Sequence, residues 1–262
     1  MPLPDLNGRT ALITGAGRGI GRAIAVDLAV AGASVAVVAR NAEQLVETIL
    51  QIELGDGDGV AFVRDLGDLD ATQALLSEVE RELGAVDILI NNAGTVAPLG
   101  PTQSLDGAEV TRSLTVNVVA PLVLSAAAIP SMRVRGWGRI VNVSSGVVAN
   151  PGAMVGGNTY ALTKSALEAH SLNLANELAG TGISVNIYRP GRVDTAMQEW
   201  IRGQDPDAVG GGPIERFTAS HASGELISPE TSARAMVVRL TSDESGGVWD
   251  VTDDLIASRS RE

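Results

Sequence analysis

Short apolar runs alternate along the chain with longer amphipathic stretches. The runs are rich in Val, Ile and Leu and lack polar alternation, which is typical of strands buried on both faces of a sheet. They predict strands at Thr10–Thr14, Ser34–Ala39, Val60–Val63, Val86–Ile90, Arg139–Val143 and Ile183–Tyr188, with a seventh around Val248–Val251.

The stretches between these runs carry helical apolar spacing. They predict helices over Ile20–Ala31, Ala42–Leu54, Asp70–Leu83, Ala108–Val134 and Thr159–Ala179, and the fourth is one helix or two. Alternating strands and helices favour an α/β fold, a doubly wound parallel sheet of about seven strands with helices on both faces. Because no linker or repeat interrupts the pattern, we expect residues 1–262 to form a single domain.

One stretch, Ala196–Ser228, departs from this rhythm. It is rich in Gly, Pro and charged residues and includes Gly210-Gly211-Gly212-Pro213. We expect an inserted, mobile segment that forms a lid over the substrate. Its apolar candidates for contact with a medium-sized, partly apolar substrate are Met197, Trp200, Ile201, Ile214 and Phe217.

The composition limits the classes of partner. A formal net charge of −12 repels phosphodiester backbones and anionic lipid, so we expect no nucleic-acid or membrane partner. The lack of cysteine excludes thiolate nucleophiles, disulfides and Cys-ligated metals. The chain starts without the features of a signal peptide, and its apolar runs fall short of the roughly 18 residues of a membrane helix. We therefore expect a soluble cytoplasmic protein.

A glycine-rich turn, Thr14-Gly15-Ala16-Gly17-Arg18-Gly19-Ile20-Gly21, follows the first strand and opens the first helix. Glycines allow the backbone to approach a pyrophosphate closely, and the helix N-terminus offers free N–H groups and a favourable dipole. A glycine turn alone also fits a plain tight turn. Its placement between strand and helix favours dinucleotide binding.

The end of the second strand bears on the choice of nucleotide. A site for NAD usually places a carboxylate there to accept from the ribose 2′-hydroxyl, but Ala39 and Arg40 occupy this end. Arg40, together with Arg18 of the glycine turn, would attract a 2′-phosphate. We therefore expect NADP(H) in preference to NAD(H). The alternative is that Arg40 is a solvated surface charge.

Candidate acid–base chemistry lies at the start of the helix expected from Thr159. Tyr160 and Lys164 are four positions apart, on one helical face. A neighbouring ammonium favours the phenolate and lowers the pKa of the phenol, which makes a proton donor and acceptor for a carbonyl oxygen. Upstream, Ser144-Ser145 ends the fifth strand, where a hydroxyl can orient that oxygen. Asn117, on an earlier helix, could hold a water or a backbone group in a proton relay.

With these residues in place, the chain resembles the short-chain dehydrogenase/reductase family in its single-domain form, along nearly its whole length. The resemblance rests on Thr14–Gly21, Asp65-Leu66, Asn91-Asn92-Ala93-Gly94, Asn117, Ser144-Ser145, Tyr160/Lys164 and Pro190-Gly191-Arg192-Val193-Asp194-Thr195. It implies a Rossmann-type domain that transfers a hydride between NAD(P)(H) and a ketone or secondary alcohol, without a metal.

The resemblance also implies a role for each matched position. Asp65 and Leu66 would bracket the adenine. A floor under the cofactor would come from Asn91, Ala93 and Gly94. The carboxamide would bind Val193 and Thr195, after the turn Pro190-Gly191. Ser145, the second serine of its pair, would position the carbonyl that Tyr160 protonates. Lys164 would hold the nicotinamide ribose, and Asn117 would complete a water-linked proton path. The equivalents of the long helices form dimer interfaces in this family, so we expect a homodimer or homotetramer.

Two stretches depart from the family pattern. Ser145 and Tyr160 are 15 positions apart, slightly more than is common, which suggests an altered substrate pocket. The tail Gly246–Asp254 lacks the Asp-Gly-Gly signature of many fatty-acid reductases and argues against that activity. His170 and His221 make no metal-ligand cluster, and Asp253 and Asp254 are expected to be solvated. The alternatives to a reductase are a catalytically silent cofactor-binding regulatory or scaffold protein and, among enzymes, a dehydratase or epimerase.

Overall fold

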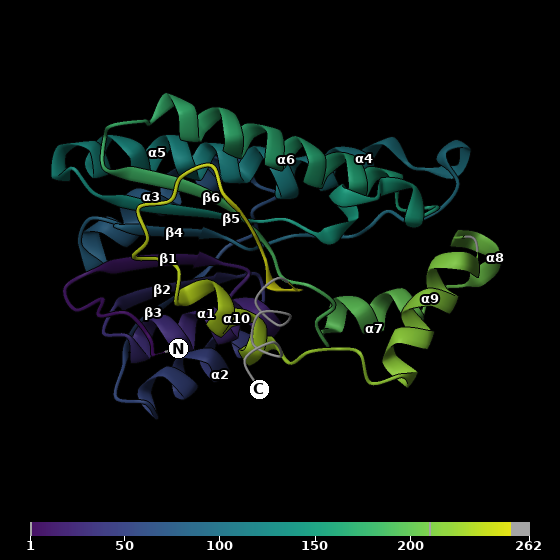
Figure 1. The fold of residues 1–262 in the computed structure, drawn as a ribbon, viewed down its shortest axis with the longest axis horizontal. Helices are drawn as coiled ribbons and strands as arrows, with labels where there is room; N and C mark the ends of the chain where they lie inside the picture. The colour runs from purple at the N-terminus through teal and green to yellow at the C-terminus, as the bar shows by residue number, and fades with distance from the viewer. Residues whose placement is uncertain (1, 210, 253–262) are drawn as a thin grey trace.

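The structure is a computed structural model that describes residues 2–209 and 211–252. Within these residues the centre is a seven-stranded parallel sheet of order β3-β2-β1-β4-β5-β6-β7 (Figure 1). The strands are β1 (Thr10–Thr14), β2 (Ser34–Ala39), β3 (Asp58–Val63), β4 (Ile88–Asn91), β5 (Gly138–Val143), β6 (Ile183–Arg189) and β7 (Val248–Asp250). The strand order reverses between β1 and β4, which opens a crevice at the carboxyl ends of these strands. The predicted doubly wound fold is confirmed.

Helices cover both faces of the sheet (Figure 1). One face carries α1 (Gly19–Val30), α2 (Ala42–Glu53) and α10 (Pro229–Val237), and the other carries α3 (Leu69–Leu83), α4 (Gly107–Leu114), α5 (Ala120–Arg135) and α6 (Asn158–Glu177). Two apolar cores result, because successive strand side chains point to opposite faces. Ile13 packs in the core beneath α1, whereas its neighbour Leu12 packs beneath α5.

The run from Gly107 to Arg135 is one continuous helical rod. A π-helical turn, Thr115–Val119, joins α4 to α5. By length and composition this rod could cross a membrane, so the expectation that no segment reaches that length is wrong here. The rod packs on α3, α6 and the sheet, and a core helix of a globular domain passes the same test.

The segment after β6 is mostly helical. It contains α7 (Ala196–Arg202), α8 (Pro206–Val209) and α9 (Gly211–Ala222), which project beyond the edge of the sheet (Figure 1). The periodicity predicts none of these helices, nor α10, and the role of the segment as an inserted, mobile lid stays a prediction. Asp253 and Asp254 lie outside the described residues.

Candidate active site

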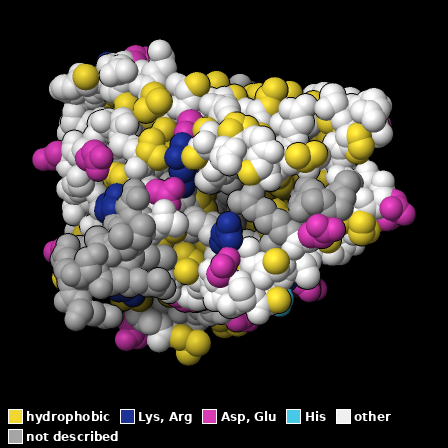
Figure 2. Space-filling model, turned by 45° about the vertical axis from the view of Figure 1, so that its right-hand side comes forward, with side chains coloured by type: hydrophobic (Ala, Val, Ile, Leu, Met, Phe, Trp, Pro, Cys, Tyr) yellow, Lys and Arg dark blue, Asp and Glu magenta, His cyan; other side chains and the backbone are white. Residues whose placement is uncertain are grey.

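A cleft of about 1130 Å³ runs along the carboxyl ends of the strands. In the space-filling view the surface is hollowed near its centre, with basic side chains around the hollow (Figure 2). Most residues expected at the site line this cleft: Gly15, Arg18, Gly19, Ile20, Gly21, Arg40, Asp65, Leu66, Ala93, Gly94, Ser145, Tyr160, Lys164, Pro190, Gly191, Val193 and Thr195. Segments distant in sequence therefore meet in one continuous space.

The glycine turn is held tightly against the end of β4. The Asn92 side chain donates to the carbonyl oxygens of Thr14 and Gly15, at 2.9 and 3.2 Å. In return, the Thr14 hydroxyl accepts from the backbone N–H groups of Asn92 and Ala93. A side chain at Gly21 would collide with the Gly15 carbonyl oxygen and the Asn92 amide. Only glycine fits this contact, so the turn is a compact cradle of backbone.

The N-terminus of α1 opens into the cleft without a cap. Asn41 and Asp68 cap α2 and α3 with their side chains, but Arg18, at the cap position of α1, makes no such hydrogen bond. The first N–H groups of a helix need partners, and the dipole there favours an anion. The cradle and the free helix end together fit a pyrophosphate.

Basic residues gather at the end of the cleft nearest β2 and β3. Arg112 of α4 makes a bidentate ion pair with Asp65, at 3.0 and 2.8 Å. Although partial burial raises the pKa of Asp65, the hydrogen bonds from Arg112 and from the Gly67 N–H hold it below its ordinary value. Within the described part of the chain, Arg18 and Arg40 line the cleft and form no ion pair.

Tyr160 and Lys164 project from α6 into the cleft, and both are buried. The Lys164 ammonium donates to the Val143 carbonyl oxygen at 2.8 Å and lies 5.9 Å from the centre of the Tyr160 ring. Burial raises the pKa of Tyr160, against a lowering by the hydrogen bond from Ser145. Burial, and not the expected lowering by Lys164, therefore dominates the pKa of Tyr160. Burial also lowers the pKa of Lys164 to about 8, against the opposing charge of Glu168.

The two adjacent serines have different surroundings. Ser144 is buried and donates to Glu168 at 2.7 Å. Glu168 also accepts two hydrogen bonds from Arg189, at 2.9 and 2.8 Å. Ser145 accepts from the Val147 N–H and begins the short helical turn Gly146–Ala149. The geometry favours Ser145 as the serine next to Tyr160, since Ser144 is committed to a structural network.

Two expected site residues lie behind the wall of the cleft. Asn91 does not line it, because its amide donates to Asn142 within the sheet, at 2.8 Å. The role of Asn91 beneath the cofactor stays a prediction, and at this point the structure places the side chain of Asn92 in the lining. Asn117 is buried in the π-helical turn, where it bonds both backbone groups of Thr95 and the Thr163 hydroxyl. It fixes the loop after β4 from behind.

The outer part of the cleft is an apolar chamber around Tyr160. Val96, Met154 and Ile201 pack with the Tyr160 ring, and Met197 and Phe217 lie against them. Of the expected lid residues, Met197, Ile201 and Phe217 line the cleft, whereas Trp200 and Ile214 do not. Motif reasoning missed Asn92, Thr95, Met154 and Gln198. Of these, only Asn92 stands within a recognisable motif.

Among the described residues no three His, Cys, Asp or Glu side chains lie close enough to hold a metal. His170 lies on α6 and His221 on α9, well separated in the chain.

The fold and the cleft define an α/β protein of the doubly wound class, and comparison with known proteins identifies its family. The family model described as short chain dehydrogenase matches residues 9–206. The chain belongs to this family, whose members are oxidoreductases that bind NAD(P) and act on alcohol and carbonyl groups.

Individual relatives agree with this assignment. A short chain dehydrogenase of Pseudocercospora fijiensis is 38% identical over 207 residues, 78% of this chain but only 64% of that longer protein. The 2,3-dihydro-2,3-dihydroxybenzoate dehydrogenase of Bacillus subtilis is 33% identical and aligns over 95% of this chain and 94% of its own. A solved structure from Beutenbergia cavernae, described as a putative NAD(P)-dependent gluconate 5-dehydrogenase with NADP bound at low occupancy, is 35% identical. Its TM-score is 0.82 over 97% of this chain and 98% of that one.

Proposed function

We propose that this chain transfers a hydride between NADP(H) and a ketone or secondary alcohol, with Tyr160 as the acid–base group. The observation that carries the proposal is the meeting of Tyr160, Ser145 and Lys164 in a cleft continuous with the glycine turn. A phenol, a hydroxyl and an ammonium are the groups that carbonyl reduction requires around the reacting oxygen.

The cleft fits a dinucleotide at several points. The backbone cradle at Gly15 and Gly21 and the uncapped end of α1 would hold the pyrophosphate. Asp65 and Leu66 would border the adenine. The floor beneath the nicotinamide half would come from Ala93 and Gly94. The remaining lining toward the nicotinamide is Pro190, Gly191, Val193 and Thr195. When bound, the nicotinamide supplies or accepts the hydride.

NADP(H) is the proposed preference because of the unpaired basic side chains at the adenosine end. Among the described residues, ion pairs neutralise Arg64 and Arg112 but leave Arg18 and Arg40 available. No carboxylate stands at the end of β2, where Ala39 is followed by Arg40. Guanidinium groups bind a phosphate with charge-assisted bidentate hydrogen bonds.

Each residue of the proposed site has a separate role in carbonyl reduction. Ser145 donates a hydrogen bond that orients the substrate oxygen, and Tyr160 gives that oxygen its proton. Burial favours the neutral phenol, so the proton donor is present at neutral pH. Lys164 holds positive charge beside the phenolate that remains, and Asn117 keeps the loop at Thr95 in place. In oxidation the same groups act in reverse.

The direct test is oxidation of NADPH or NADH with a panel of ketones, aldehydes and 3-oxoacyl thioesters. We expect NADPH to give the higher kcat/KM, and a tenfold or greater advantage for NADH would contradict the role of Arg40 (about 1.4 kcal/mol per tenfold). The variant Tyr160→Phe should lose turnover by at least about 100-fold while it still binds NADPH. A wild type that binds NADPH but turns over no carbonyl would favour a silent cofactor-binding protein.

A further inference from the structure

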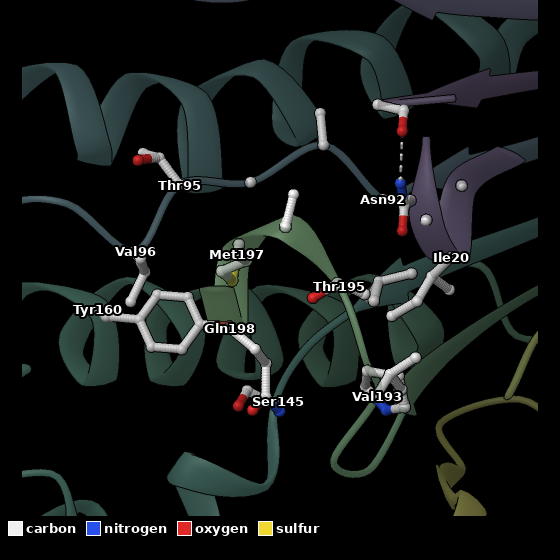
Figure 3. Close-up of a pocket in the computed structure, with 18 of the residues that line it drawn as sticks. Ile20, Asn92, Thr95, Val96, Ser145, Tyr160, Val193, Thr195, Met197 and Gln198 are labelled. Carbon is white, nitrogen blue, oxygen red and sulfur yellow. Dashed lines mark hydrogen bonds between the residues drawn. The ribbon is translucent and has the colours of Figure 1, made fainter. Parts of the chain in front are cut away.

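Gln198, near the start of α7, is a buried polar side chain without an assigned function. It is only 8% exposed, and it lines the cleft. Its Oε1 atom is buried and has no hydrogen-bond partner in the part of the chain that the structure describes. In Figure 3 the side chain extends from α7 toward Ser145, beside Tyr160. An unpaired buried amide costs stability unless a ligand completes it.

The surroundings of Gln198 offer this amide few polar partners. The neighbouring side chains Met197 and Ile201 belong to the apolar chamber around the Tyr160 ring. The polar side chains that Figure 3 shows near Gln198 are Ser145 and Tyr160. In the proposed mechanism both of them bind the reacting oxygen. A polar atom of a bound substrate would complete the hydrogen bonding of the Gln198 amide.

We propose that Gln198 binds a second polar group of the substrate, a hydroxyl or carbonyl oxygen on the carbon next to the reacting carbon. The proposal rests on the function proposed above. Because the Gln198 side chain extends toward Ser145 (Figure 3), we place its partner on the carbon next to the one whose oxygen Ser145 would orient. A glutamine amide both donates and accepts, which suits a hydroxyl that does the same.

This arrangement defines a substrate class. If the neighbouring group is a hydroxyl, the reduced substrate is a vicinal diol and the oxidised substrate an α-hydroxy ketone. If it is a carbonyl, the same single hydride transfer links an α-hydroxy ketone to an α-diketone. Val96, Met154 and Phe217 belong to the apolar chamber around Tyr160 and line the cleft, so the other substituent of the reacting carbon would be apolar. Gln198 is thus a specificity-determining residue that selects adjacent oxygen atoms.

The test compares two ketones that differ by one hydroxyl, α-hydroxycyclohexanone and cyclohexanone, in wild type and in Gln198→Met. Methionine keeps the length of the side chain and removes its hydrogen bonds. We expect wild type to prefer the hydroxy ketone by at least about tenfold in kcat/KM, since a site built to bond a hydroxyl discriminates against its absence. Gln198→Met should reduce this ratio to near one, mainly through KM.

The matched control is Gln204→Met, because Gln204 follows α7 and its amide donates to the Trp200 carbonyl oxygen outside the cleft. This variant should keep the wild-type ratio. A wild type that reduces both ketones equally, or a Gln198→Met variant that keeps the wild-type ratio, overturns the proposal alone. The proposal is also overturned if fluorescence titration shows that the main defect of Gln198→Met is weaker NADPH binding, because Gln198 would then bind the cofactor and not the substrate. Failure of wild type to reduce any carbonyl overturns the proposed function and this proposal with it.

Discussion

Tyr160 and Lys164 lie one helical turn apart, yet burial moves their pKa values in opposite directions. It raises the pKa of the phenol and lowers that of the ammonium to about 8. Both shifts have the same origin, since a buried site disfavours the charged form of each group. The resting site therefore favours the neutral phenol, the form that carries the proton for carbonyl reduction. The phenolate that alcohol oxidation requires forms only at high pH.

This asymmetry predicts different pH profiles for the two reaction directions. Alcohol oxidation requires the deprotonated phenol, so its kcat/KM should rise steadily from about pH 6 to about pH 10. Carbonyl reduction requires the protonated phenol and should hold its rate at neutral pH. Initial rates in both directions at saturating cofactor check this. An oxidation rate that peaks below about pH 7 would contradict the assignment of Tyr160.

Glu168 influences the site through Lys164, one turn along α6. Its charge raises the pKa of Lys164 against the effect of burial. Glu168→Gln removes this charge, so the pKa of Lys164 should fall below about 8. If the ammonium assists the reaction, the alkaline limb of the reduction profile then moves to lower pH. The change should also cost about 1–3 kcal/mol of unfolding free energy, because Arg189 loses a charged partner.

The pH profile separates a positioning role for Glu168 from a merely structural one. Glu177→Gln is the control, since Glu177 is exposed at the end of the same helix. It should leave both profile and stability unchanged. A Glu168→Gln variant that is less stable but keeps the wild-type profile would show that Glu168 acts on the fold alone.

At the scale of the elements, periodicity alone located the sheet and its main helices. β1 to β6 lie within two residues of the predicted runs at either end. This succeeds because a strand buried on both faces must be continuously apolar. The same periodicity does not indicate the helices of the segment Ala196–Ser228, because its Gly and Pro content resembles loop composition. Its short helices are stabilised by packing on the cleft, which local sequence does not reveal.

The helix α10 did carry a start signal that was overlooked. Ser228 caps it by accepting from the Thr231 N–H, and Pro229 occupies its first position. The residues of the candidate site also differ in whether the local sequence carries a signal for them. Tyr160, Lys164 and the glycine turn stand in motifs and were found. Gln198 and Met154 have no motif, and only burial and placement distinguish them from any other glutamine or methionine.

The contact between the glycine turn and α1 gives an element-scale prediction. Alanine normally favours a helix interior over glycine by about 1 kcal/mol. At Gly21, however, the added methyl group would collide with the Gly15 carbonyl oxygen and the Asn92 amide. We expect Gly21→Ala to lose about 2–4 kcal/mol of unfolding free energy and to weaken NADPH binding. Urea unfolding and cofactor titration measure the two effects.

Gly107, the first residue of α4, provides the control for this substitution. A methyl group there meets no atom within 4 Å, and Gly107 does not line the cleft. Gly107→Ala should be neutral or slightly stabilising. If Gly21→Ala and Gly107→Ala change the free energy of unfolding equally, the close contact at Gly21 does not restrict the residue at that position.

At the scale of the whole molecule, the outer face formed by α5 and α6 carries exposed apolar side chains. Leu162 and Leu172 on α6 are 52% and 43% exposed, and Leu122 on α5 is 36% exposed. α6 packs beside α4 and the π-helical turn, so these residues belong to one helical layer (Figure 1). Such a layer suits self-association, since apolar surface is stabilised by burial. Each protomer also carries a net charge of −12, and the resulting repulsion opposes association at low salt.

These two opposing features predict a homo-oligomer that is favoured by salt. Light scattering after size exclusion should give a multiple of the 26.9 kDa protomer mass. The fraction of protein in smaller oligomers or monomers should increase at low ionic strength. Leu172→Glu should shift the protein toward the monomer, because the new carboxylate would be buried without a partner at the interface. Leu50→Glu is the matched control: Leu50 on α2 is 49% exposed on the opposite face of the sheet, and its variant should keep the wild-type mass. A wild type that is monomeric at every salt concentration would show that the α5–α6 layer has no copy of this chain as its partner.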